Sequence, residues 1–123
     1  MAAGTKIRLL ALAATAVALA AISTGGWAAT KMKFWNSTAN TITELYLAPT
    51  GTDQWGPNQC LNDDNKSVEA DERLLLTDVT PGQYDVKLVD DKGRHCTLHN
   101  ITVKGGTAYA FSITEKQVKN CAP

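Results

Sequence analysis

The sequence has few of the residues that carry catalytic chemistry. It contains only two histidines, His95 and His99, and it has no Gly-x-Ser-x-Gly elbow, no phosphate-binding loop and no zinc-protease motif. The adjacent carboxylates Asp90 and Asp91 fall in a turn, where acidic side chains normally support the turn and face solvent. These absences argue against an enzyme, and a small secreted hydrolase or enzyme inhibitor is retained only as the last alternative.

The chain also lacks an excess of charge. Twelve Lys and Arg residues balance twelve Asp and Glu residues, and removing the first 28 residues leaves ten against twelve, a net charge of −2. Binding to nucleic acid requires clustered Lys and Arg that displace counterions from the phosphates. We therefore expect no nucleic-acid partner.

No apolar run is long enough to span a bilayer. The uncharged apolar segment at 9–22 is shorter than the roughly 20 residues that a membrane span needs. Two basic residues precede it, and small residues follow it up to Ala28, which is the order of a signal peptide. The pattern predicts a cleaved signal peptide at 1–28 and a mature domain at 29–123. That domain is expected in the periplasm or outside the cell, with no integral membrane anchor after cleavage.

Cysteine is scarce, and all of it lies in the predicted mature domain. Cys60, Cys96 and Cys121 contain no Cys-x-x-Cys pair, which argues for a structural role and against a redox role. Export favours one disulfide and leaves one thiol over. Cys121 lies near the end of the sequence, so pairing it with Cys60 or with Cys96 would pin a segment that otherwise frays. Either bridge should stabilise the domain by roughly 2–4 kcal/mol.

Helical periodicity is absent after the leader. Short runs rich in Thr, Val, Ile, Tyr and Phe alternate with clusters of Gly, Pro, Asn and Asp, which is typical of strands and turns. The pattern predicts an all-β domain, a small antiparallel β-sandwich of about six or seven strands. The candidate strands are Lys31–Asn36, Thr41–Ala48, Arg73–Val79, Gln83–Asp90, His95–Lys104 and Thr107–Thr114.

Alternation within the strands predicts which side chains are buried. In the segment at 83–90 the apolar residues alternate with Gln83, Asp85 and Lys87, so the polar set should face water. In the segment at 107–114 the bulky side chains, Tyr109 among them, should face the core. The predicted core consists of Leu75 or Leu76, Tyr84, Val86, Leu88, Leu98, Ile101, Val103, Tyr109, Phe111 and Ile113.

Two blocks of sequence carry a family resemblance. Residues 45–58 read LYLAPTGTDQWGPN and residues 82–93 read GQYDVKLVDDKG. Together they resemble small exported bacterial proteins of unknown function that share Leu-Tyr-x-Ser-Pro, Trp-Gly and a later Gly-x-Tyr-Asp. This chain has Ala48 where that pattern usually has Ser, and a longer acidic insert before Leu74. Residues 78–88, which read DVTPGQYDVKL and are followed by Gly93 and Gly105-Gly106, resemble an edge of transthyretin-like and carboxypeptidase-regulatory-like β-sandwiches. The resemblance implies an exported β-sandwich and supplies no reaction.

The acidic insert raises the question of a metal site. Counted from Asp63, an EF-hand loop needs Gly at its sixth position and Glu at its twelfth, where this chain has Val68 and Leu74. The segment is therefore not an EF-hand. An irregular Ca²⁺ site remains the alternative to a solvated loop, and a calcium-binding or calcium-stabilised module is the second functional hypothesis. Apart from Ca²⁺ we expect no cofactor. The candidate ligands are Asp63, Asp64 and Asp71, with Asp53 as a further candidate.

One aromatic residue stands in an expected loop. Trp55 lies among turn-forming residues, where it can stack on a sugar or anchor a partner protein. The alternative is that it folds back as a plug over an open end of the sandwich. The leading hypothesis is an exported, non-catalytic binding or accessory module whose partner is an envelope or extracellular protein or glycan. Its candidate contact residues are Trp55, Asp53, Gln54, Asn58 and Tyr46.

Overall fold

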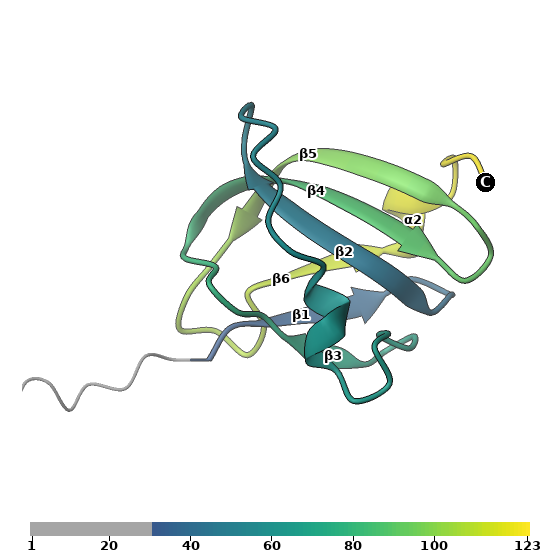
Figure 1. Ribbon diagram of the computed structural model, residues 1–123, viewed down its shortest axis with the longest axis horizontal. Helices are drawn as coiled ribbons and strands as arrows, with labels where there is room; N and C mark the ends of the chain where they lie inside the picture. Colours follow the sequence, from purple (N-terminus) through teal and green to yellow (C-terminus); the bar gives the residue numbers. More distant parts are fainter. Residues whose placement is uncertain (1–30) are drawn as a thin grey trace, which may run out of the picture.

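The computed structural model describes residues 31–123, and the predicted signal peptide lies outside them. Six strands follow one another along the chain (Figure 1). The six predicted strands correspond to them in order, although β3 and β6 are shorter than expected. The strands are β1 (Lys33–Ser37), β2 (Ile42–Pro49), β3 (Arg73–Leu75), β4 (Gly82–Asp90), β5 (His95–Val103) and β6 (Phe111–Thr114).

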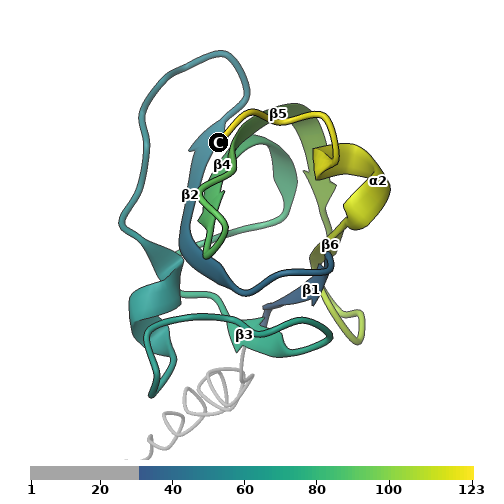
Figure 2. The same cartoon turned by 90° about the vertical axis from the view of Figure 1, so that its right-hand side faces the viewer.

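The strands form two three-stranded sheets. One sheet has the order β2-β4-β5 and the other the order β3-β1-β6. Neighbouring strands pair antiparallel except β1 and β6, which run parallel. Seen along the strands, the two sheets enclose the core between them (Figure 2). The arrangement confirms the predicted small all-β sandwich and adds one parallel pair that the sequence did not indicate.

The core lies between the inner faces of the two sheets. Phe34 of β1 and Phe111 of β6 are both buried, and their ring centroids are 4.9 Å apart. Burying a side chain of this size contributes roughly 1.5–3 kcal/mol. The prediction of the core is largely confirmed, with Tyr84, Leu98 and Ile101 partly buried against it. Its buried members include Leu76, Val86, Leu88, Val103, Phe111 and Ile113.

A β-bulge in β2 determines which of its side chains face outward. The register between β2 and β4 shifts between Ile42 and Glu44. Because a bulge inserts one unpaired residue, Ile42 can point inward together with Leu45 and Leu47, all of which are buried. Tyr46 alternates with these two leucines and is directed to the outer face of the sheet.

Tyr109 is not a core residue, and its predicted burial was wrong. Its side chain is 36% exposed, whereas the neighbouring Ala110 is buried. Strand β6 begins only at Phe111, and in the preceding loop the Thr107 hydroxyl donates to the Tyr109 carbonyl. The alternation of a strand therefore does not extend back to Tyr109. Of the two leucines left open by the sequence, the buried one is Leu76.

Two short helical segments accompany the sheets. They are the 3₁₀ turn η3 (Gln59–Asn62) and the single helical turn α2 (Glu115–Val118). The sequence indicated neither, because four residues are too few to show helical periodicity. No helix in residues 31–123 is long and apolar enough to cross a membrane.

An ionic network ties the β4–β5 hairpin to α2. Arg94 Nε donates to Asp90 Oδ2 at 2.7 Å, and Arg94 Nη1 donates to Glu115 Oε2 at 2.8 Å. Burial alone would raise the pKa of Asp90, but hydrogen bonds from Arg94, Asn40 and two backbone N–H groups outweigh it and lower the pKa to about 2. Hydrogen bonds from Arg94 and from the Ala39 backbone lower the pKa of Glu115 to about 2. The network therefore stays ionised at neutral pH.

One disulfide pins the segment that follows α2. Cys96 of β5 pairs with Cys121, with an S–S distance of 2.04 Å. This is one of the two pairings that the sequence left open, and it is compatible with an oxidising compartment. The remaining thiol, Cys60, is fully buried, and burial raises its pKa to about 12. Because the thiolate is the reactive form, Cys60 is inert at neutral pH.

Candidate functional site

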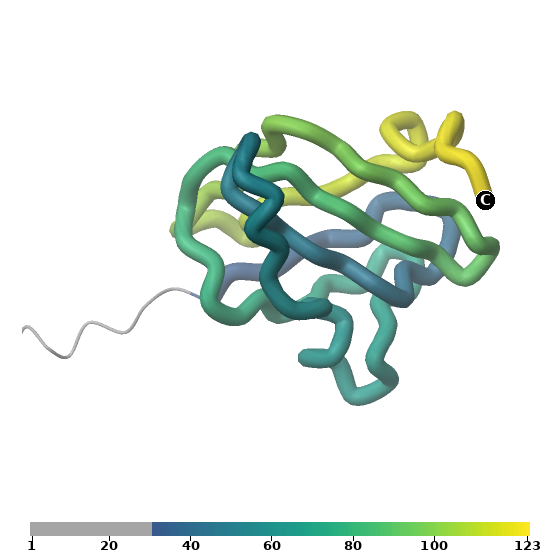
Figure 3. Tube along the Cα trace, turned by 45° about the horizontal axis from the view of Figure 1, so that its top comes forward, coloured from purple at the N-terminus to yellow at the C-terminus, as the bar shows by residue number. Residues whose placement is uncertain are grey.

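The segment that carries Trp55 runs beside the free edge of β2. After Pro49 ends the strand, the Thr52 N–H donates to the Pro49 carbonyl at 3.0 Å and closes a tight turn. The chain then returns along β2, where the Gly56 N–H donates to the Leu47 carbonyl at 2.9 Å. Figure 3 shows this segment leaving the end of the sheet and coming back past β2. The return brings Trp55 against the sheet.

Asn58 fixes the base of this segment. Its Oδ1 accepts hydrogen bonds from the backbone N–H groups of Leu45 and Cys60, each at 3.0 Å. Asn58 therefore anchors the loop to β2 and caps η3. Asp53 and Gln54, two further candidates, are exposed at the tip of the loop, and Asp53 has a φ of 54°.

Trp55 meets Lys87 and Tyr46 on the outer face of the sheet. Tyr46 of β2 and Lys87 of β4 are cross-strand partners. The Lys87 Nζ lies 4.6 Å from the centre of the Trp55 ring and 5.2 Å from that of Tyr46. A cation over an aromatic face is attracted by the ring quadrupole, by about 0.5–1 kcal/mol at exposed sites. Two of the predicted contact residues are thus brought together around a cation that the sequence analysis did not single out.

The carboxylate of Glu44 lies beside Tyr46 and belongs to the same cluster of side chains. The Tyr46 hydroxyl donates to Glu44 Oε1 at 2.7 Å, and this hydrogen bond raises the pKa of Tyr46. Glu44, Tyr46 and Lys87 line a depression of about 340 Å³, together with side chains of β5 that include His95 and Thr97. Among residues 31–123 no carboxylate lies within 4 Å of the Lys87 ammonium. We call Glu44, Tyr46, Trp55 and Lys87 the aromatic face.

The Trp55 ring lies on the outside of the sandwich. It is half-buried and lies over the outer face of β4, and it is not among the residues of the core. The ring therefore does not enter the space between the two sheets. No hydrogen-bond acceptor for its indole N–H is found in the described part of the chain, whereas the Trp35 Nε1 donates to Asp71 Oδ1 at 2.9 Å.

Asp85 is buried, which corrects the prediction that it faces water. Its carboxylate accepts hydrogen bonds from the backbone N–H of Gly51 at 3.0 Å and from that of Asn100 at 3.1 Å. These two hydrogen bonds lower its pKa. His99 Nδ1 lies 3.4 Å from the same carboxylate. Asp85 thus holds the loop before Trp55 to β4 and β5, and it positions the aromatic face without being part of it.

The sequence does not reveal the register between β2 and β4, on which this site depends. Lys87 was predicted to face water, and it does lie on the outer face, half-buried. Its place between two aromatic rings depends on the pairing of Tyr46 with Lys87, which neither strand reveals alone. Asp85 was missed because its hydrogen-bond partners lie in other parts of the chain, Gly51 in the loop after β2 and Asn100 in β5.

The candidate calcium ligands do not converge. Asp71 accepts the Trp35 indole N–H, and Asp63 Oδ2 accepts the Asn65 backbone N–H at 2.8 Å in a local turn. Asp64 is exposed. Over residues 31–123 no three His, Cys, Asp or Glu side chains come together in an arrangement that could hold a metal ion.

Comparisons with known proteins do not assign the chain to a family. No family model, no curated protein and no solved structure matches it. The resemblance of the 45–58 and 82–93 blocks to small exported proteins therefore stays a prediction. The proposed function therefore rests on the geometry of the aromatic face.

Proposed function

We propose that this domain is an exported, non-catalytic binding module that contacts an envelope protein or glycan through the aromatic face. The observation that carries the proposal is the set of groups around the Lys87 ammonium. Its ammonium lies against both the Trp55 and the Tyr46 ring and has no carboxylate partner within 4 Å in residues 31–123. A fixed cation beside two aromatic rings offers a partner both charge and stacking area.

The donors of the aromatic face indicate the chemistry of the partner. The Lys87 ammonium and the Trp55 indole N–H are both donors, and neither can act as an acceptor. A partner that presents carboxylate, carbonyl or sugar hydroxyl oxygens beside an apolar surface satisfies both. Trp and Tyr also dominate the energetic centres of protein interfaces, so the same face suits a protein contact.

The loop that carries Trp55 is preorganised for binding. Asn58 and Asp85 hold it at both ends through backbone N–H groups, and Gly56 adds a bond to the edge of β2. Because the loop is ordered before contact, a partner does not have to supply the free energy of ordering it. This favours a contact surface over a flexible linker.

Capture from the native cell envelope tests the proposal. The mature domain, immobilised as wild type and as Trp55→Ala, is exposed in parallel to envelope extract, and the retained material is compared. Trp35→Ala is the matched control, since it removes the same side chain from the other sheet. We expect a partner retained by the wild type and by Trp35→Ala and lost from Trp55→Ala. Protease or glycosidase treatment of the extract identifies a protein or a glycan.

Two outcomes would oppose the proposal. Equal retention by Trp55→Ala and wild type would show that the aromatic face is not the contact. Loss from Trp35→Ala alone would move the contact to the sheet β3-β1-β6. Far-UV circular dichroism of each variant separates a lost contact from a lost fold.

A further inference from the structure

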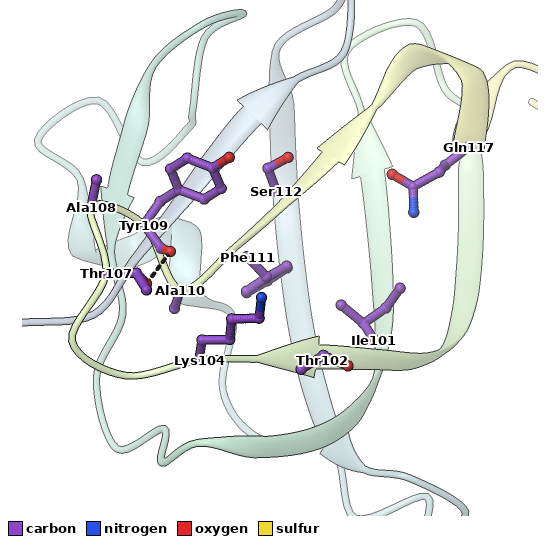
Figure 4. A pocket seen from close by; sticks show the side chains of 10 residues that line it. All are labelled: Ile101, Thr102, Lys104, Thr107, Ala108, Tyr109, Ala110, Phe111, Ser112 and Gln117. Carbon is purple, nitrogen blue, oxygen red and sulfur yellow. Dashed lines mark hydrogen bonds between the residues drawn. The ribbon is translucent and has the colours of Figure 1, made fainter.

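A cavity opens between the two sheets on the side opposite β2. Strands β5 and β6 each end their sheet, and no pairing joins them among the described strands. The Lys104 N–H donates to the Ala110 carbonyl at 2.9 Å and closes the seam at one end. The Cys96–Cys121 disulfide and the Arg94–Glu115 ion pair hold the other end. Between these closures lies a cavity of about 500 Å³ (Figure 4), which we call the seam cavity.

The floor of the seam cavity is apolar. Phe111 and Ala110 are buried, and Ile101 is half-buried beside them. Figure 4 shows Phe111 and Ile101 on either side of the opening between the strands. A volume of about 500 Å³ lies within the roughly 300–1,000 Å³ of sites that bind small molecules. The floor can therefore accept a compact apolar group.

Three side chains in the lining of the seam cavity offer hydrogen-bond donors. In Figure 4 the Lys104 ammonium and the Gln117 amide nitrogen both point into the space between the strands. Gln117 is held in this orientation because its Oε1 accepts the Thr114 N–H at 2.8 Å. Ser112 adds a hydroxyl to the same lining. The side chains that converge here thus favour a ligand rich in acceptor oxygens.

The charge of the seam cavity has one sign. Lys104 is the single charged residue in its lining, and no carboxylate lies within 4 Å of its ammonium in residues 31–123. In a domain whose net charge is −2 over 29–123, this is a local site of positive charge. Charge-assisted hydrogen bonds from ammonium to carboxylate are about twice as strong as neutral ones.

We propose that the seam cavity binds a carboxylate attached to a compact apolar group. The carboxylate meets Lys104, with Gln117 and Ser112 as further donors, and the apolar group lies on Phe111 and Ile101. A free organic acid and the C-terminal residue of a peptide share this chemistry. The proposal is independent of the aromatic face, because the seam cavity opens at β5 and β6 and none of its lining residues belongs to that face.

Titration with matched probes tests the proposal. Phenylacetate and a short peptide ending in Phe with a free carboxylate are compared with phenylacetamide and the same peptide amidated, by calorimetry and by backbone amide shifts. We expect the carboxylates to bind at least about tenfold tighter than the amides, with shifts at Lys104, Ser112 and Gln117. Binding of either acid supports the proposal. If only one of the two binds, that result also identifies the source of the carboxylate.

Variants of the chain sharpen the test. Lys104→Met should weaken binding of the carboxylate probes by roughly tenfold or more. Lys92→Met, the same change of charge in the exposed turn between β4 and β5, should leave it unaffected. Ser112→Phe should fill the cavity and abolish binding while the fold is retained. The proposal is overturned if folded wild type binds no probe at millimolar concentration, if the amides bind as well as the acids, or if Lys92→Met and Lys104→Met have equal effects.

Discussion

Trp35 and Trp55 stand in comparable surroundings on opposite sheets. The Arg73 guanidinium lies 4.6 Å from the Trp35 ring, and the Lys87 ammonium lies 4.6 Å from the Trp55 ring. The difference lies in the indole N–H, which in Trp35 is bound to Asp71 and in Trp55 has no acceptor within residues 31–123. At the scale of single residues, Trp35 ties β1 to the loop before β3, and Trp55 retains a donor for a partner.

The carboxylate of Asp90 predicts a dependence of stability on acid pH. Its pKa is about 2 in the folded state, below its ordinary value near 4, so the unfolded chain binds the proton first as pH falls. The stabilisation is fully present above about pH 4 and is lost as the pH falls towards about 2, by about 2 kcal/mol. Urea unfolding at a series of pH values measures this loss.

Asp90→Asn should flatten that dependence and lower the stability at pH 7. Asp91→Asn is the control, because its exposed side chain lies in the same turn. If Asp90→Asn keeps the slope of wild type between pH 4 and pH 2, the assignment to Asp90 is wrong.

At the scale of elements, the disulfide holds the segment after α2 to β5. It closes a loop of sequence separation 25. Constraining a loop of that length in the unfolded chain is worth roughly 3–4 kcal/mol. We expect the double variant Cys96→Ser with Cys121→Ser to lose about this much free energy of unfolding in a denaturant titration. In a separate labelling experiment, the buried thiol of Cys60 in the native protein should resist a thiol reagent. A loss below about 1 kcal/mol, or rapid labelling of Cys60, would contradict this account.

The loop before Trp55 depends on Asp85. Removing its carboxylate in Asp85→Ala leaves the Gly51 and Asn100 N–H groups without their acceptor. Hydrogen exchange of these two amides should accelerate by about tenfold or more while the amides of the core keep their protection. Partner capture should weaken because the loop is no longer preorganised. Unchanged exchange at both amides would show that Asp85 does not hold the loop.

Elements with regular alternation were predictable, and irregular ones were not. The apolar residues of β4 and β5 alternate over most of each strand, and a clear turn separates the two, so their bounds were nearly correct. Tyr109 was misplaced because β6 begins two residues later. The buried position of Asp85 depends on contacts with the loop after β2 and with β5, and the pairing of Tyr46 with Lys87 depends on register. Contacts of this kind are determined by the tertiary fold and leave no local mark in the sequence.

At the scale of the whole molecule, two surfaces remain available once the sandwich has formed. The aromatic face covers the outside of one sheet, and the seam cavity opens where the two sheets part between β5 and β6. Phe111 and Ala110 belong both to the core and to the floor of the seam cavity, but no residue of the aromatic face lines that cavity. Variants in one surface should therefore leave binding at the other unchanged.

The central claim is that the aromatic face serves a partner and is dispensable for folding. The free energy of unfolding of Trp55→Ala, measured by denaturant titration without any partner, tests it most directly. The account predicts a value within about 1 kcal/mol of wild type, as for a surface side chain outside the core. A loss of roughly 3–5 kcal/mol, as expected for removal of a buried aromatic such as Phe34, would show that Trp55 belongs to the fold and would contradict the account.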